Sequence, residues 1–277
     1  MRRVQWRFDR SAPACDAWVT VFVPPMAPPA GGFPVIVMLD GDAVASVLHM
    51  HLQHHTEPVI VVAVGYGLQG DSLKAARAFD YTPGPTLPDP RAPQWDNGGA
   101  AAFLRWMDVE LRTALTAAFP VEHSAWTLYG HSYGGLFGLF ALCQPEAVFN
   151  RYVLASPSIW WRDGAIRNDL EARLALSSLS ADVLIMAGER ESWHANAVGS
   201  DGSPDSRTGG WATLPAAQAL ADRLRQLNEG ITRFDTIAGG THASMARQSI
   251  FPALRFAAES SGASDGSLSS RQARSLS

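Results

Sequence analysis

Cysteine is scarce in this chain, and long hydrophobic runs are absent. The 277 residues include only two cysteines, Cys15 and Cys143, too few for a disulfide framework. We therefore expect both to be free thiols of a cytoplasmic protein. A membrane-spanning helix needs about 20 consecutive apolar residues, and the sequence has no such run, nor an apolar run of signal-peptide length behind its basic N-terminus. We therefore expect no membrane segment.

Positive charge is also in short supply. The chain has 22 Lys and Arg against 26 Asp and Glu, a formal net charge of −4. Nonspecific binding of nucleic acid requires a basic face, so this balance excludes a general nucleic-acid-binding protein. Binding of an anionic ligand would need a local cluster of arginines.

Hydrophobic residues, by contrast, make up 47% of the chain, enough to bury a sizeable core. No linker divides the chain, and α/β folds of about 250 residues are often one unit. We therefore predict a single domain over residues 1–258. The Ser-, Gly- and Ala-rich segment 259–277 predicts a disordered tail.

Short β-branched runs alternate with amphipathic segments along the chain. Seven runs are predicted to be strands, at residues 18–23, 35–39, 59–64, 125–129, 152–155, 183–187 and 233–237. The second and third are continuously apolar, which is typical of parallel strands covered on both faces. Apolar residues at helical spacing predict helices over 100–119 and 214–227. The alternation indicates an α/β fold with a doubly wound, mostly parallel sheet flanked by helices.

One short motif carries the chemistry. Residues 130–134, Gly-His-Ser-Tyr-Gly, match the Gly-x-Ser-x-Gly pattern, and they lie between a predicted strand and a helical run at 135–142. Strand, sharp turn and helix are the context of the nucleophile elbow of α/β-hydrolases, in which the serine hydroxyl is exposed at the edge of the sheet. The sequence therefore predicts an α/β-hydrolase fold with Ser132 as the nucleophile.

A serine needs a base, and the base needs an orienting carboxylate. In this fold the acid and then the histidine follow the serine in the chain. His242 comes directly after the last predicted strand and is predicted to be the base. Glu191 follows the strand at 183–187 and is the favoured acid; Glu189 and a Ser–His dyad without an acid are the alternatives.

Backbone amides are expected to stabilise the oxyanion. One donor should be the amide of Tyr133, the residue after the nucleophile. The second should come from the loop after the strand at 35–39, where Asp42 is favoured and Gly41 is the alternative. An ordinary β-to-α turn remains possible at that loop.

Four segments in this order resemble a known family: Asp40-Gly41-Asp42, the run 77–83 (Arg-Ala-Phe-Asp-Tyr-Thr-Pro), the elbow extended to Phe137, and the run 155–161 (Ala-Ser-Pro-Ser-Ile-Trp-Trp). Together they resemble the enterobactin-esterase type of ferric-siderophore hydrolase, within the esterase-D-like branch of the α/β-hydrolases. The resemblance covers roughly residues 15–256. We expect no counterpart of the N-terminal membrane anchor of the periplasmic members, and the loops at 83–98 and 192–210 match least.

The resemblance implies hydrolysis of ester or lactone bonds in a siderophore, with Ser132 and His242 as nucleophile and base. It also places Arg77 near the substrate. A ferric tris-catecholate is a trianion, so the acidic chain would need focused positive charge and aromatic surface. The candidate substrate-binding residues are Arg77, Trp160, Trp161, Arg162, Arg190 and His194, with Arg91 and Arg207 in the same predicted rim loops.

Several readings stay open at this stage. Arg77 could instead pair with Asp80 or with a loop carboxylate, and the two tryptophans could belong to the core. The histidine-rich segment 49–55 invites a metal site, but ligation needs further partners, and we expect neither a metal nor a cofactor. A general carboxylesterase or thioesterase, an acyltransferase and a non-catalytic siderophore-binding protein remain alternatives to the small-molecule ester hydrolase.

Overall fold

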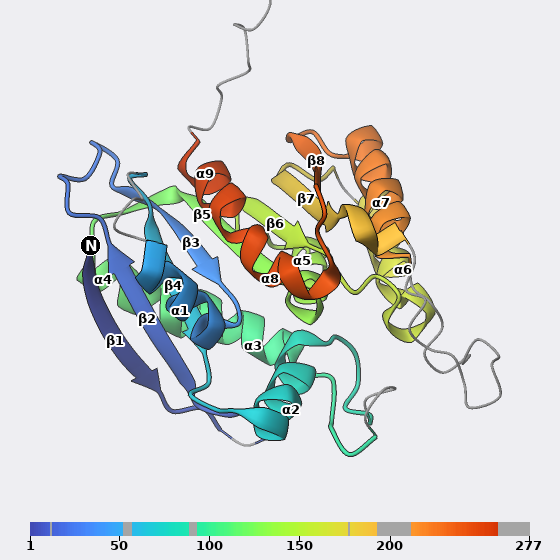
Figure 1. Cartoon of the computed structure of the whole chain (residues 1–277), viewed down its shortest axis with the longest axis horizontal. Helices are drawn as coiled ribbons and strands as arrows, with labels where there is room; N and C mark the ends of the chain where they lie inside the picture. Colours follow the sequence, from blue (N-terminus) through green and yellow to red (C-terminus); the bar gives the residue numbers. More distant parts are fainter. Residues whose placement is uncertain (12, 52–56, 89–92, 177, 193–211, 260–277) are drawn as a thin grey trace, which may run out of the picture.

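All strands that the structure describes belong to one sheet. The computed structural model describes residues 1–11, 13–51, 57–88, 93–176, 178–192 and 212–259. The strand order is β1-β2-β4-β3-β5-β6-β7-β8 (Figure 1). Pairing is parallel from β4 through β3 to β8, whereas β2 is antiparallel to both β4 and β1. The strands are β1 (Arg2–Phe8), β2 (Ala17–Val23), β3 (Phe33–Met38), β4 (Ile60–Gly65), β5 (Val121–His131), β6 (Arg151–Ala155), β7 (Asp182–Gly188) and β8 (Thr232–Ile237).

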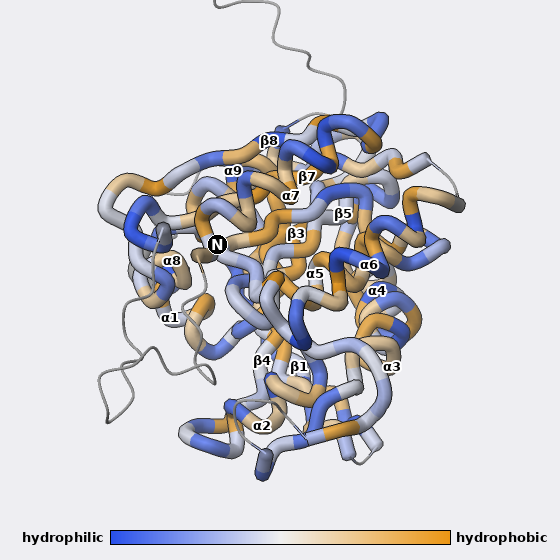
Figure 2. The backbone as a smooth tube through the Cα atoms, turned by 90° about the vertical axis from the view of Figure 1, so that its right-hand side faces the viewer, coloured by the Kyte–Doolittle hydropathy of each residue, from blue (hydrophilic) through white to orange (hydrophobic). Residues whose placement is uncertain are grey.

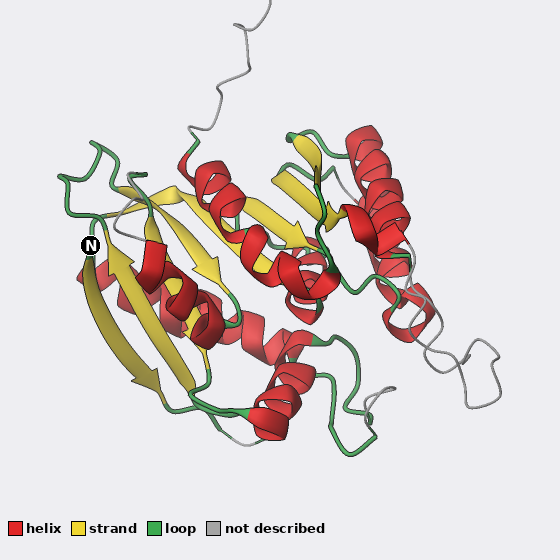
Figure 3. Ribbon diagram, viewed as in Figure 1, coloured by secondary structure: helices red, strands yellow, loops and turns green. Residues whose placement is uncertain are grey.

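Helices cover both faces of this sheet (Figure 3). On one face, α1, α8 and α9 bury apolar side chains against alternate residues of the central strands. On the other face, α2 to α7 pack on the intervening residues. The helices are α1 (Gly41–His51), α2 (Gly70–Tyr81), α3 (Ala100–Trp106), α4 (Arg112–Ala118), α5 (Tyr133–Leu142), α6 (Trp161–Leu176), α7 (Thr213–Leu227), α8 (His242–Gln248) and α9 (Ile250–Ala258).

The central strands are mostly apolar because both of their faces are buried. Every residue of β4 and of β6 is buried, and Figure 2 shows the hydrophobic colour concentrated in the strands between the helices. Side chains of successive residues point to opposite faces, so a continuous Val and Ile run fills both halves of the core. The predicted α/β fold with a mostly parallel sheet flanked by helices is confirmed.

Two predictions of local structure need correction. The strand β1 was not predicted, because its polar residues alternate with only partly buried apolar ones at the edge of the sheet. The predicted single helix over 100–119 is divided into α3, a π-helical turn (Met107–Leu111) and α4. A π-turn keeps the apolar spacing nearly helical, so the sequence periodicity does not reveal it.

The predicted domain boundaries stay a prediction. The sheet runs from residue 2 to residue 237, and α9 returns over it to end at residue 258. Apart from Glu259, the predicted tail lies outside the described residues. No helix in the described part of the chain is long and apolar enough to cross a membrane.

Candidate active site

The turn between β5 and α5 has the strained geometry of a nucleophile elbow. Ser132 joins the two elements with φ 59° and ψ −116°, a conformation that L-residues rarely adopt. The glycines are needed because the backbone closes on itself. A Cβ on Gly130 would lie 2.1 Å from the carbonyl oxygen of Gly134, and one on Gly135 would lie 2.8 Å from Cα of Pro157. Glycines at these positions therefore allow the tight turn, which exposes the serine hydroxyl at the carboxyl ends of the parallel strands.

A chain of hydrogen bonds connects Ser132 to a buried carboxylate. Ser132 Oγ lies 3.0 Å from Nε2 of His242, and Nδ1 of His242 lies 3.0 Å from Oε2 of Glu191. His242 is the first residue of α8, whose N-terminus is fixed by a capping box between Thr241 and Ser244. The structure therefore brings together, from three separate segments, the residues predicted as nucleophile, base and acid.

Glu191 is held as an ionised acceptor. Its side chain is fully buried, and its Oε1 accepts bonds from the Ser156 hydroxyl at 2.5 Å and the Gly188 amide at 2.9 Å. Burial by itself would raise the pKa of Glu191, but hydrogen bonds from His242, Ser156 and Gly188 outweigh it and lower the pKa. The alternative acid, Glu189, is exposed and accepts a bond from the Gly239 amide at 2.8 Å. Glu189 therefore orders the loop that precedes the histidine.

His131, the residue before the nucleophile, contacts both the backbone and the ring of His242. Its Nε2 lies 2.8 Å from the backbone oxygen of His242, and the two rings have centroids 4.9 Å apart. Burial and the neighbouring His242 lower the pKa of His131 to about 4. The His131 ring is therefore neutral at neutral pH and, as Nε2 donates to the carbonyl, holds the first turn of α8 beside Ser132.

The loop after β6 supplies two further contacts that the sequence analysis missed. Ser156 has φ 43° and donates to Glu191, while Ser158 Oγ lies 3.3 Å from Ser132 Oγ. A signal was available, since this loop follows the strand next to β5 in a parallel sheet. The carboxyl ends of adjacent parallel strands meet at one edge, so these serines had to lie near Ser132.

The predicted oxyanion donors lie at two helix N-termini. Tyr133 begins α5 and Gly41 begins α1, and the first amides of a helix have no acceptor within the helix. The Asp42 side chain has a structural task, since its carboxylate accepts from the amides of Tyr66 and Gly67 at 2.9 and 3.3 Å. Any part of Asp42 in holding an oxyanion therefore falls to its backbone amide, as the sequence predicts for this loop.

The loop between β3 and α1 packs directly against the elbow. A Cβ on Gly134 would lie 3.4 Å from Cδ1 of Leu39 and 4.0 Å from Oδ2 of Asp40. Asp40 in turn binds the guanidinium of Arg77 through two bonds, at 2.5 and 3.0 Å. Burial lowers the pKa of Arg77, but the charge of Asp40 and its hydrogen bonds outweigh burial and raise it. Arg77 is thus a charged group at the edge of the site, held by a carboxylate other than Asp80.

Of the two adjacent tryptophans, Trp160 lies beside the site and Trp161 lies in the core. Trp160 is partly exposed, and its ring lies 6.0 Å from that of Tyr133. Trp161 is only 2% exposed and its side chain packs in the core, the alternative that the sequence leaves open for the two tryptophans. Arg162 covers the Trp161 ring at 4.5 Å and lies near Gly84 in the predicted rim loop.

Of the remaining candidate binding residues, the structure describes Arg190, in the turn after β7. Arg190 is exposed, and its amide donates to the Gly240 oxygen at 2.9 Å, which ties the acid-bearing turn to the histidine-bearing loop. His194, Arg91 and Arg207 lie outside the described residues. In the described ranges no cluster of three or more His, Cys, Asp or Glu side chains could hold a metal ion.

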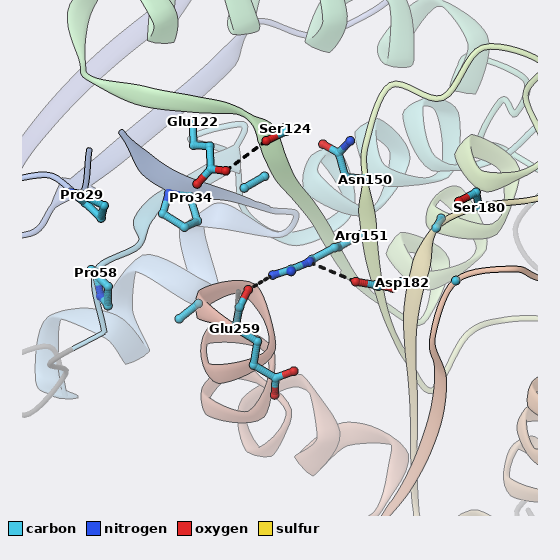
Figure 4. A pocket seen from close by; sticks show the side chains of 14 residues that line it. Pro29, Pro34, Pro58, Glu122, Ser124, Asn150, Arg151, Ser180, Asp182 and Glu259 are labelled. Atoms are coloured by element: carbon cyan, nitrogen blue, oxygen red, sulfur yellow. Dashed lines mark hydrogen bonds and ion pairs between the residues drawn. The ribbon is translucent and has the colours of Figure 1, made fainter. Parts of the chain in front are cut away.

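A cavity of about 580 Å³ lies at the opposite edge of the sheet, where the parallel strands begin (Figure 4). Arg151 occupies its centre, 3% exposed, with Asp182 at 3.4 Å and backbone oxygens at the end of α9 around its guanidinium. The cavity shares no lining residue with the triad. Its lining residues are Pro29, Pro34, Pro58, Glu122, Ser124, Ala125, Asn150, Arg151, Ser180, Ala181, Asp182, Gly230, Ala258 and Glu259.

Known proteins resemble this chain in sequence and fold. Residues 11–242 match the protein family described as "Putative esterase". Ferri-bacillibactin esterase BesA of Bacillus subtilis is 29% identical over 258 residues, covering 86% of this chain and 83% of that protein. A siderophore triacetylfusarinine C esterase of Aspergillus fumigatus is 37% identical over 160 residues, 55% of this chain and 53% of that protein.

A solved structure adds the same fold. The BES protein from Bacillus cereus superimposes with a TM-score of 0.75 and 26% identity, covering 92% of this chain and 94% of the other. The family match covers residues 11–242, so it includes all three residues of the hydrogen-bonded chain described above. The protein therefore belongs to this esterase family.

Proposed function

We propose that the protein is a serine hydrolase that cleaves ester or lactone bonds of a siderophore through an acyl-enzyme. The observation that carries this proposal is the unbroken sequence of hydrogen bonds from Ser132 through His242 to Glu191, each 3.0 Å long. A binding protein needs neither an activated serine nor a buried carboxylate behind a histidine.

The first step would acylate Ser132. His242 Nε2 accepts the hydroxyl proton as Oγ attacks the carbonyl carbon, and Glu191 stabilises the imidazolium that forms. The amides of Tyr133 and of Gly41 or Asp42 would hold the oxyanion at the N-termini of α5 and α1. His242 then gives its proton to the leaving alcohol.

The second step would release the acid. Water, deprotonated by His242, attacks the acyl-enzyme, and the proton returns to Ser132 Oγ when the ester bond breaks. No cofactor takes part, because nucleophile, base and oxyanion donors all come from the chain itself.

Support for a siderophore as substrate comes from two sides. BesA and the Aspergillus esterase carry ferri-bacillibactin and triacetylfusarinine C in their names. The loops around the triad also carry residues suited to an anionic, aromatic ligand. Trp160 is partly exposed beside Tyr133, and Arg190 is exposed in the turn that bears Glu191. Cation–π and charge-assisted contacts would suit catecholate or hydroxamate iron complexes.

The test is hydrolysis followed by mass spectrometry. The substrates are ferric enterobactin, a ferric hydroxamate-ester siderophore and a short p-nitrophenyl ester, each with the wild type and with Ser132→Ala. Rapid Ser132-dependent cleavage of one siderophore over the simple ester is the expected result. Cleavage of the simple ester alone would instead indicate a general carboxylesterase or thioesterase, and binding without cleavage would indicate a siderophore-binding protein.

A cytoplasmic location belongs to the same proposal. Cys15 and Cys143 are both free thiols, the form that reducing compartments maintain. Fractionation of cells that express the native gene, with an antibody against this chain, tests the location. Recovery in the periplasmic or extracellular fraction would overturn it.

A further inference from the structure

Ser158 contacts the nucleophile Ser132 but is not a member of the catalytic triad. Its Oγ is 3.3 Å from Ser132 Oγ, and the residue is only 1% exposed. Polar side chains buried at an active site have partners whose geometry matters, since an unsatisfied hydroxyl would be costly there. The inference drawn from this contact rests on the proposed hydrolase function.

The direction of each hydrogen bond follows from counting protons. Glu191, ionised at neutral pH, can only accept, so Nδ1 of His242 carries a proton and donates to it. Nε2 of the neutral ring is then an acceptor, and the only proton on Ser132 Oγ is used to donate to it. In the pair between Ser132 and Ser158, the donor must therefore be Ser158.

The backbone fixes Ser158 in this place. Its amide donates to the Ser132 carbonyl oxygen at 3.1 Å, and its own carbonyl oxygen accepts from the Trp161 amide at 3.1 Å. Trp161 is in turn buried in the core. The hydroxyl is thus preorganised on a rigid turn beside the atom that reacts, as effective electrostatic stabilisation requires.

We infer that Ser158 is a further catalytic residue, whose hydroxyl donates to Ser132 Oγ and stabilises the negative charge that develops on this atom. As the Ser132 proton passes to His242, the neutral bond becomes a charge-assisted one, which is shorter and roughly twice as strong. Ser158 keeps its own proton throughout. The same bond acts again when Oγ departs from the acyl-enzyme, so both steps benefit.

The effect should be moderate. Removing one donor from a full oxyanion hole costs about 100- to 1000-fold in kcat, but the charge on Ser132 Oγ is partial and passes on to the carbonyl oxygen. We expect Ser158→Ala to lower kcat by roughly 5- to 50-fold while KM stays unchanged, the pattern of an interaction made only in the transition state.

The experiment measures two reactions of the same variants. The first is steady-state hydrolysis of whichever ester the wild type cleaves fastest. The second is phosphorylation of Ser132 by diisopropyl fluorophosphate, followed by mass, in which Oγ bonds to phosphorus, fluoride leaves and the proton goes to His242. This small reagent makes few contacts beyond Oγ, so its rate reports on the nucleophile itself. Both rates should fall by similar factors in Ser158→Ala and recover in Ser158→Thr, which retains the hydroxyl.

Other outcomes are equally informative. Wild-type rates in Ser158→Ala, or faster rates, would overturn the inference, because a faster variant would mean that Ser158 competes with His242 for the Ser132 proton. A rise in KM alone would assign Ser158 to substrate binding and also overturn it. If Ser158→Ala does not fold, Ser158→Cys supplies a similar shape with a weak donor, and its rates decide instead. An inactive wild type would refute the proposed function, a result distinct from any of these.

Discussion

Buried charged side chains are stabilised differently at the two ends of the parallel strands, called here the carboxyl edge and the amino edge of the sheet. At the carboxyl edge, Glu191 is satisfied on one oxygen by Ser156 and Gly188, and its other oxygen holds a histidine that remains 33% exposed. At the amino edge, Arg151 is closed off by Asp182 and by the last backbone oxygens of α9. The same strands, β6 and β7, supply both arrangements at their opposite ends.

The difference teaches how a stable scaffold and a reactive site coexist. The Arg151 cluster ends in backbone oxygens, which have no proton to transfer. The Glu191 chain ends in Ser132, whose hydroxyl proton can move to His242 without a change in backbone position. We therefore expect substitutions at the carboxyl edge to change activity with little effect on stability, and substitutions at the amino edge to do the reverse.

The largest expected effect is that of Ser132→Ala. Loss of the nucleophile removes acyl-enzyme formation, and kcat should fall by about 10⁴- to 10⁶-fold, as for other serine hydrolases that lose this group. The free energy of unfolding should stay equal or rise slightly, because alanine carries no buried hydroxyl. Substrate turnover and chemical denaturation, measured on one preparation, test both parts, and a loss of stability above about 1 kcal/mol would contradict the separation.

Glu191→Gln should come next, with kcat lowered by about 10³- to 10⁴-fold, because the amide no longer selects the correct His242 tautomer. The pKa of Glu191 is lowered in the folded state. Its ionisation therefore stabilises the wild type above the unfolded pKa, about 4.3, and this contribution is lost as pH falls through the folded pKa. The unfolding free energy of Glu191→Gln should depend less steeply on pH in that acidic window; an equally steep curve would show that other groups carry the dependence.

At the amino edge, Arg151→Met should lower stability and leave activity nearly unchanged. The substitution leaves Asp182 and the carbonyl oxygens of Phe256 and Ala257 without their shared donor. We expect a loss of about 3 kcal/mol in unfolding free energy, within the range for breaking a buried charged network. The kcat should stay within about twofold of the wild type at a temperature where the variant is folded. Lys at this position, which keeps the charge but not the planar fork, should recover part of the loss.

The sequence predicts the carboxyl edge better than the amino edge, and the reason is the range of the signals. Ser132 is identified by the other four residues of its motif and by the strand and helix predicted on either side of it. Once the fold is known, chain order points to His242 and places the acid in the loop after β7, where Glu191 is favoured over Glu189. In a parallel sheet the carboxyl ends of all strands lie at the same side of the sheet. A residue in the loop that directly follows a strand can therefore be placed near that side from the sequence alone.

The features that escaped prediction depend on contacts between distant segments. Arg151 directly precedes the predicted strand at 152–155, and its partners lie far along the chain, in Asp182 of β7 and in the backbone oxygens of α9. Whether Trp160 or Trp161 faces the core depends on the left-handed residues Arg162 and Asp163 that follow them, a turn without a local sequence signature. Ser158 shows the same limit, because its donor role emerges only when the protons of the triad are counted.

The smallest expected effect is the coupling between the two edges, measured with the double variant Glu191→Gln/Arg151→Met. Arg151 begins β6 and Ser156 follows its end, so β6 is the shortest covalent path between the two clusters. Parallel ladders to β5 and β7 hold this strand on both sides over its whole length, and a strand fixed in this way does not slide when one end loses a partner. The changes in unfolding free energy should therefore add within about 0.5 kcal/mol, and the loss of kcat from Glu191→Gln should be the same with or without Arg151. A coupling above about 1 kcal/mol, or a kcat of Arg151→Met that falls as far as that of Glu191→Gln, would show that β6 transmits strain from one edge to the other and that the scaffold and the site are not independent.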